Sequence, residues 1–170
     1  MNGHPGGEAH TRRMLALADL EPGASVLDMG AGSGEAIKLL RNAGYEATGI
    51  DLEPRGEGVE QGSFLHTPYP GGCFDAVLSQ CAFFVSGDVP GALREAHRVL
   101  KPGGKFMLSD VFSREPEPLL NAAGFEALAL EDMTDVWRAY YLEALWQEDA
   151  PCCEIPRGKC RYWLVIARKV

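Results

Sequence analysis

The chain lacks a long apolar run, an excess of basic residues and an even set of cysteines. No stretch of its 170 residues approaches the length of a membrane-spanning helix, and the N-terminal residues MNGHPGGEAH contain no signal-peptide core. A formal net charge of −8 disfavours nucleic acid as a partner, because phosphate binding requires clustered Lys and Arg. Five cysteines, an odd number, favour reduced thiols over a disulfide framework. These absences predict a cytoplasmic protein with no membrane span and no nucleic-acid partner.

The composition is that of a globular protein, with 46% hydrophobic and 24% charged residues. Its length predicts a single domain over residues 1–170. The negative charge is concentrated between Glu115 and Glu154, where ten acidic residues accompany one basic residue, Arg138. We interpret this segment as a solvated acidic face; a surface that repels anionic substrates or meets a basic partner is the alternative.

The most informative stretch is VLDMGAGSG, residues 26–34. Asp28 lies near the end of an expected buried strand, and Gly30, Gly32 and Gly34 follow at spacings of two. A strand that turns through glycines brings backbone N–H groups and a helix N-terminus to one point, which suits a small ligand in close contact with the backbone. The dinucleotide-binding fingerprint instead places its third glycine three residues after the second. The spacing therefore disfavours a nicotinamide-dependent oxidoreductase, which stays as an alternative.

Strand-like and helix-like segments alternate along the chain. Helices are expected over Thr11–Ala18 with Thr11 as N-cap, Glu35–Ala43, Val89–Leu100, Pro118–Ala123 and Thr134–Glu148. Strands are expected over Ala24–Met29, Glu46–Asp51, Val59–Ser63, Phe74–Ser79, Lys105–Asp110, Phe125–Leu130 and Tyr162–Ala167. This order predicts an α/β fold with a doubly wound, mostly parallel sheet, and a ligand beyond the carboxyl ends of the strands.

Two segments rich in Gly and Pro interrupt this order. The stretch Glu53–Gly62 is too short and too rich in Gly and Pro for a full helix between the second and third strands. That side of the sheet is therefore expected to be exposed or covered by a partner chain. The segment Lys101–Gly104, of sequence KPGG, is expected to interrupt regular secondary structure before the fifth strand.

Asp51 lies at the expected end of the second strand, in the sequence GIDLE. A carboxylate at this point can accept two hydrogen bonds from the vicinal hydroxyls of a ribose. Its distance from Asp28 matches the spacing of a ribose-binding acid after a glycine-rich turn. We favour the ribose role over the alternative, a turn or helix cap.

Several stretches together resemble the class I S-adenosyl-L-methionine (SAM)-dependent methyltransferases. VLDMGAGSG resembles their motif I, and FDAVLSQCAFF (74–84) resembles motif IV. LREAHRVLKPGGKFMLSD (93–110), LLNAAGFEALAL (119–130) and YWLVIARK (162–169) are similar to the segments that follow. The resemblance covers nearly the whole chain and is strongest to the ubiquinone/menaquinone-biosynthesis type. It implies a Rossmann-like sheet with an antiparallel last strand, SAM as cofactor, and methyl transfer to a small-molecule acceptor.

The resemblance also implies a role for each matching residue. The implied cofactor-binding residues are Asp28, Gly30, Ala31, Gly32, Gly34, Asp51, Leu52, Ser63, Phe64, Ser79, Gln80 and Cys81. The glycine stretch would pack against the methionine and ribose parts, Leu52 would lie against adenine, and Cys81 would lie near the transferred methyl. Ser63 stands where the family often has an aspartate that holds the adenine amino group. Its hydroxyl can still accept that hydrogen bond, and Phe64 offers a stacking surface.

The sequence shows no obvious catalytic pair. Methyl transfer from a sulfonium is an in-line displacement that depends mainly on alignment and on exclusion of water, so such a pair is not required. The candidate proton acceptors are His10, His66 and Asp110. A surface or structural role is the alternative for each histidine, and a capping role is the alternative for Asp110.

An aromatic helix is the candidate substrate lid. Trp137, Tyr140 and Tyr141 recur at helical spacing between the last two expected strands. The alternative is a helix docked on the sheet, and a dimer contact is also compatible with this stripe.

The remaining cysteines predict no metal site. Cys152, Cys153 and Cys160 match no ordinary zinc spacing and are interpreted as free thiols, with a soft metal or metalloid as the alternative. The rival to an enzyme is a non-catalytic SAM-binding partner subunit of a larger complex. A homodimer or a protein partner is compatible with both interpretations.

Overall fold

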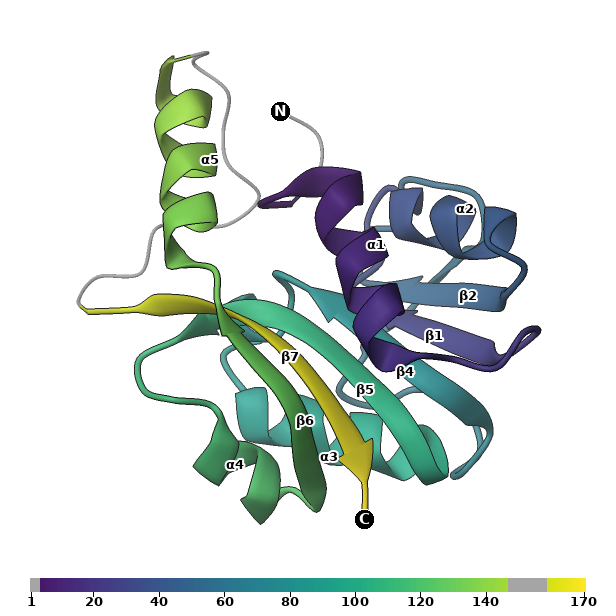
Figure 1. The fold of residues 1–170 in the computed structure, drawn as a ribbon. Coiled ribbons are helices and arrows are strands. Elements are labelled where there is room, and N and C mark those ends of the chain that lie inside the picture. Colours follow the sequence, from purple (N-terminus) through teal and green to yellow (C-terminus); the bar gives the residue numbers. More distant parts are fainter. Residues whose placement is uncertain (1–3, 147–158) are drawn as a thin grey trace.

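The structure is a computed structural model that describes residues 4–146 and 159–170 (Figure 1). Its strands are β1 (Ser25–Met29), β2 (Glu46–Asp51), β3 (Val59–Gln61), β4 (Phe74–Gln80), β5 (Leu100–Phe112), β6 (Phe125–Asp132) and β7 (Arg161–Lys169). They form one seven-stranded sheet in the order β3-β2-β1-β4-β5-β7-β6, in which β7 runs antiparallel to β5 and β6 and the other pairs are parallel. This confirms the predicted Rossmann-like α/β fold with its antiparallel last strand.

Helices cover both faces of the sheet (Figure 1). The helices are α1 (Gly7–Ala18), α2 (Glu35–Asn42), α3 (Val89–Val99), α4 (Glu117–Ala122), α5 (Thr134–Trp146) and the short 3₁₀ helix η1 (Phe84–Ser86). Side chains of β1 alternate between two cores: Val26 packs with α1 and α2, whereas Leu27 and Met29 pack in the cluster that includes α3 and α4. Because both faces of the sheet are covered, four of the five residues of β1 are buried. Helix α5 lies beyond the sheet, at the end of the sheet where β5 terminates (Figure 1).

Most expected elements match the observed ones within two residues, and two expectations are wrong. Helix α1 begins at Gly7, so Thr11 is not its N-cap; it lies inside the helix, and its hydroxyl donates to Gln80 Oε1 at 3.2 Å. The KPGG segment does not interrupt regular secondary structure before the fifth strand, because β5 begins at Leu100 and runs through it. The extra residues form an irregularity in the pairing of β4 with β5, where Gly103 takes a φ of +75°.

The connection between β2 and β3 contains no helix, as predicted. Residues 52–58 form a short loop that packs directly on the turn after β1. A Cβ added to Gly56 would lie 1.8 Å from the carbonyl oxygen of Ser33, and one added to Gly34 would lie 3.1 Å from that of Glu57. The loop therefore needs glycine where it meets the turn.

Among the described residues, no helix combines the length and the apolar character that crossing a bilayer requires.

Candidate functional site

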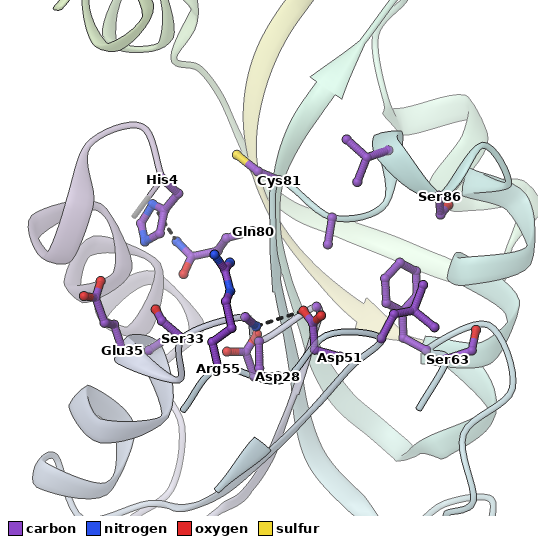
Figure 2. A pocket seen from close by; sticks show the side chains of 18 of the residues that line it. His4, Asp28, Ser33, Glu35, Asp51, Arg55, Ser63, Gln80, Cys81 and Ser86 are labelled. Carbon is purple, nitrogen blue, oxygen red and sulfur yellow. Dashed lines mark hydrogen bonds between the residues drawn. The ribbon is translucent and has the colours of Figure 1, made fainter. Parts of the chain in front are cut away.

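A cavity of about 370 Å³ lies at the carboxyl ends of β1, β2 and β4 (Figure 2). The chain leaves β1 toward β2 on one side and reaches β4 on the other, so the cavity lies where the strand order reverses. Ten of the twelve predicted cofactor-binding residues line it: Asp28, Gly30, Ala31, Gly32, Asp51, Leu52, Ser63, Phe64, Gln80 and Cys81. The sheet thus brings together residues as far apart in the sequence as Asp28 and Cys81.

The turn after β1 forms the floor of this cavity. The backbone N–H groups of Gly30 and Ala31 both donate to the carbonyl of Ile50, at 2.9 and 3.2 Å, which ties the turn to β2. Gly30 has a φ of +86°, and a Cβ added there would lie 2.3 Å from the Cβ of Ala82. Glycine is required at this position because the turn after β4 approaches so closely.

The Asp51 carboxylate is held in place by the backbone. Its Oδ2 accepts from the N–H of Gly32 at 2.9 Å, and its Oδ1 accepts from the N–H of Glu53 at 2.9 Å. A carboxylate oxygen has two acceptor sites, so each oxygen keeps one for a ligand. A turn-capping role and a ligand-binding role for Asp51 are therefore compatible.

Asp28 is only 3% exposed, although it lines the cavity. Burial, followed by the nearby charge of Asp51, raises the pKa of Asp28 to about 7. Both causes penalise the charged carboxylate. A cationic group of a ligand placed beside Asp28 would favour its ionised form.

Two of the predicted cofactor-binding residues do not reach the cavity wall. Gly34 is the N-cap of α2, and its φ of +73° allows the chain to turn into that helix. The Ser79 side chain is fully buried, and its hydroxyl donates to the carbonyl of Met29 at 2.7 Å. Ser79 therefore joins β4 to β1 inside the sheet and does not face the cavity.

One end of the cavity is formed by Gln80, Cys81 and His4, and His4 was missed by the sequence reasoning (Figure 2). The Gln80 amide nitrogen lies 3.3 Å from His4 Nδ1, and the Thr11 hydroxyl lies 3.2 Å from His4 Nε2. Burial lowers the pKa of His4 below its ordinary value. The imidazole is therefore neutral at pH 7 and can exchange hydrogen bonds with both neighbours.

The three candidate proton acceptors are not on the cavity wall. His10 is buried inside α1, and burial lowers its pKa to about 4. His66 is exposed in the segment after β3. Asp110 is 2% exposed and accepts from the backbone N–H of Phe84 at 3.0 Å, so it holds the turn after β4. The structure therefore brings none of them to the position of a base within this cavity.

The aromatic residues of the candidate lid are buried. Trp137, Tyr140 and Tyr141 pack in one cluster with Cys81 and Tyr162. Cys81 belongs both to this cluster and to the cavity wall, and its Sγ lies 3.3 Å from the Tyr162 hydroxyl. Helix α5 therefore contacts the cavity through Cys81. Cys81 also has a φ of +57°, which is uncommon for a residue other than glycine and is found often at functional sites.

The cysteines outside the cavity do not form a described site. Cys160 packs against the aromatic cluster, whereas Cys152 and Cys153 lie outside the described residues. In residues 4–146 and 159–170, no group of three or more His, Cys, Asp or Glu side chains is arranged to hold a metal ion.

Sequence reasoning missed nine residues of the cavity wall. They are His4, Ser33, Glu35, Ala36, Arg55, Leu65, Ala82, Val85 and Ser86. Arg55 is notable because its backbone N–H donates to the carbonyl of Gly32 at 2.9 Å and its side chain extends into the cavity (Figure 2). The sequence predicted that this segment forms no full helix, but it carried no signal that Arg55 would pack on the glycine turn.

Comparison with known proteins finds similarity to methyltransferases. Residues 27–108 match the family described as "Methyltransferase domain". The chain is also similar to a glycine/sarcosine/dimethylglycine N-methyltransferase of Actinopolyspora halophila, with 36% identity in an alignment 120 residues long that covers 61% of this chain and 21% of that protein. The chain spans from 21% to 48% of the length of the first curated relatives that it matches.

Solved structures show the same fold. The [4+2]-cyclase SpnF superimposes with a TM-score of 0.75 at 23% identity, over 95% of this chain and 80% of that one. The Burkholderia thailandensis 1,6-didemethyltoxoflavin-N1-methyltransferase, solved with bound 1,6-didemethyltoxoflavin and S-adenosylhomocysteine, gives a TM-score of 0.67 at 22% identity, over 95% of this chain and 79% of that one. At these identities the likeness establishes the fold, and the activity has to be argued from the site.

Proposed function

Residues 27–108 form a methyltransferase domain of the class I SAM-dependent family, and from this premise we propose that the chain transfers a methyl group from SAM to a small-molecule acceptor. The observation that carries the proposal is the cavity at the point where the strand order reverses. It combines a glycine turn, a fixed carboxylate at Asp51 and a polar end at Gln80.

The cavity wall suits the chemical groups of SAM. The Asp51 carboxylate keeps an acceptor site on each oxygen for the two ribose hydroxyls. Phe64 stacks on Phe83 at 5.4 Å between ring centroids, so a ring placed against it meets a surface backed by the core. Leu52 lies on the same wall, and the Ser63 hydroxyl already accepts from the N–H of Leu65 at 3.2 Å. We assign the ribose to Asp51 and the adenine to the region of Leu52, Ser63 and Phe64.

Asp28 and Gln80 would hold the methionine part. Asp28 is placed to receive the ammonium group, either directly or through water, because a cation there offsets the burial of its carboxylate. Gln80 is oriented by Thr11 and lies beside His4 at the end of the cavity that Cys81 also lines. When bound, SAM supplies an activated methyl group on a sulfonium. The residues of this chain align it and exclude water from it.

The acceptor that suits this site is small and weakly polar. The cavity meets the aromatic cluster of α5 at Cys81, so its acceptor end is bordered by apolar and aromatic side chains. None of His10, His66 and Asp110 lines the wall. His4 does line the wall, but burial lowers its pKa and makes it a weaker base. An acceptor that needs no strong base, such as a soft nucleophile or a stabilised carbanion, is therefore favoured. The resemblance to the quinone-biosynthesis type remains a prediction, because the names of the matched relatives include acceptors of several kinds.

Two experiments test the proposal. Titration calorimetry with SAM, S-adenosylhomocysteine and NAD should give binding of the first two ligands and none of the third. Incubation with methyl-labelled SAM and a small-molecule extract should transfer label to an extract component, and Asp51→Ala should reduce the transfer when SAM is below saturation. Binding without transfer to any tested extract would support the non-catalytic subunit instead, and absence of SAM binding would exclude both.

Cytoplasmic location and association with a second copy or a protein partner are also predictions. Gel filtration with light scattering tests the association directly, because a dimer doubles the 18.4 kDa mass of the chain.

A further inference from the structure

Arg55 brings a positive charge into the cavity from the loop that replaces a helix. The loop is fixed to the glycine turn by the hydrogen bond from Arg55 N to the Gly32 carbonyl, at 2.9 Å. The side chain then extends over the turn, and its Nη2 lies 3.3 Å from the position that a Cβ on Gly32 would take. Figure 2 shows it rising into the cavity on the side where Gln80 and His4 lie.

The cavity wall carries more acidic side chains than basic ones. Asp28, Glu35 and Asp51 provide three carboxyl groups, and Arg55 is the one lysine or arginine among the residues that line the cavity. His4 adds no charge at neutral pH, because burial lowers its pKa. SAM carries two positive centres, the sulfonium and the ammonium, and one negative centre, the carboxylate. The wall therefore offers carboxyl groups to the two positive centres of SAM and one guanidinium to its negative centre.

The Arg55 guanidinium has no partner within the described residues. Other arginines of the chain are paired: Arg13 with Glu131, Arg98 with Glu95 and Arg168 with Glu126. Asp51 lies on the same wall, but its two oxygens accept from the backbone of Gly32 and Glu53 and make no ion pair with Arg55. All five donors of the guanidinium are therefore available to a ligand.

We propose that Arg55 binds the carboxylate of the methionine part of SAM. The inference rests on the proposed function, because that carboxylate is the only anionic group that SAM contains. A guanidinium donates two parallel hydrogen bonds to a carboxylate, which fixes the orientation as well as the charge. Arg55 thus anchors the amino-acid end of the ligand from the loop, while Asp51 anchors the sugar from β2.

Calorimetry with two ligands tests this assignment. S-Adenosylhomocysteine carries the carboxylate, and its decarboxylated analogue, S-adenosyl-3-thiopropylamine, keeps the amine and lacks the carboxylate. Arg55→Gln should weaken binding of the first by about 10- to 100-fold, as expected for charge-assisted hydrogen bonds. Binding of the second should change by less than about twofold, because no carboxylate remains to be lost. Arg55→Lys should restore part of the loss, since lysine keeps the charge but not the paired geometry.

The controls separate this inference from other effects. Arg94→Gln removes an exposed arginine of α3 that does not line the cavity, and it should leave both affinities unchanged. Because Arg55 is exposed, Arg55→Gln should keep the melting temperature of the wild type. An equal loss for both ligands, or no loss for either, would overturn the role of Arg55 while leaving the proposed function intact. Failure of the wild type to bind S-adenosylhomocysteine would instead overturn the proposed function, and this inference with it.

Discussion

Ionisation of Asp28 should couple ligand binding to pH near neutrality. In the free protein, burial and the charge of Asp51 raise the pKa of Asp28 to about 7, so at pH 7 about half of the molecules carry a protonated Asp28. The ammonium group of SAM favours the ionised carboxylate and therefore lowers this pKa in the complex. Binding below pH 7 must then release a proton. The association constant should rise by up to about tenfold per pH unit below pH 7 and level off above it.

Calorimetry measures this coupling directly. Titrations with S-adenosylhomocysteine, which keeps the ammonium group, in buffers of different ionisation enthalpy give the number of protons released. We expect about 0.9 at pH 6, about 0.5 at pH 7 and nearly none at pH 8.5. Asp28→Asn serves as the control, because it is nearly isosteric and does not titrate; its affinity should be lower and nearly independent of pH. A wild type that releases no proton and binds equally well at pH 6 and pH 8 would refute the account of Asp28.

Three further changes have definite expected outcomes. Asp51→Ala should weaken SAM binding by about 1.5–3 kcal/mol in calorimetry, because it removes charged hydrogen bonds to the ribose, and unchanged affinity would remove Asp51 from the site. Gly30→Ala and Gly23→Ala both place alanine at a φ near +80°, at a cost of about 1–2 kcal/mol, but only the first meets another side chain. Urea unfolding should show a further loss of about 1–3 kcal/mol for Gly30→Ala, and equal losses would contradict the close packing on Ala82. His10 has its pKa lowered to about 4 from 6.5, so its contribution to stability is complete above pH 6.5 and is lost as the pH falls toward 4. Between pH 7 and pH 4.5 the wild type should lose up to about 3 kcal/mol more unfolding free energy than His10→Gln, and parallel curves would contradict this.

Local patterns predicted the parts of the site that strands deliver. The strand before the glycine turn is buried at four of its five positions, and the strand that ends at Asp51 is buried at three of its six. The two strands are parallel neighbours, so their last residues meet at one edge of the sheet. The pattern of alternating strands and helices also fixed most element boundaries. The absence of a helix between β2 and β3 followed directly from the Gly and Pro content of that segment.

The contributions of side chains from loops and helices could not be predicted in the same way. His4 and Arg55 reach the cavity because their segments pack on it, and no periodicity in the sequence records such packing. Ser79 fits the family pattern, but alternation along β4 turns its hydroxyl into the sheet, where it meets the Met29 carbonyl. Thr11 has the chemistry of a cap, but an earlier turn of helix begins at Gly7. For each of these residues the deciding contact is tertiary, and the local sequence does not record it.

Because the loop after β2 is short, the part of the proposed site that would hold the purine is open to solvent. Leu52, which lines the cavity, is 65% exposed, and residues 52–58 place no helix above it. A base lying against Leu52 would keep one edge in water. Synthetic cofactors that carry bulky tags on that edge would then need no enlarged pocket, so the unaltered protein offers a natural starting point for selective labelling chemistry.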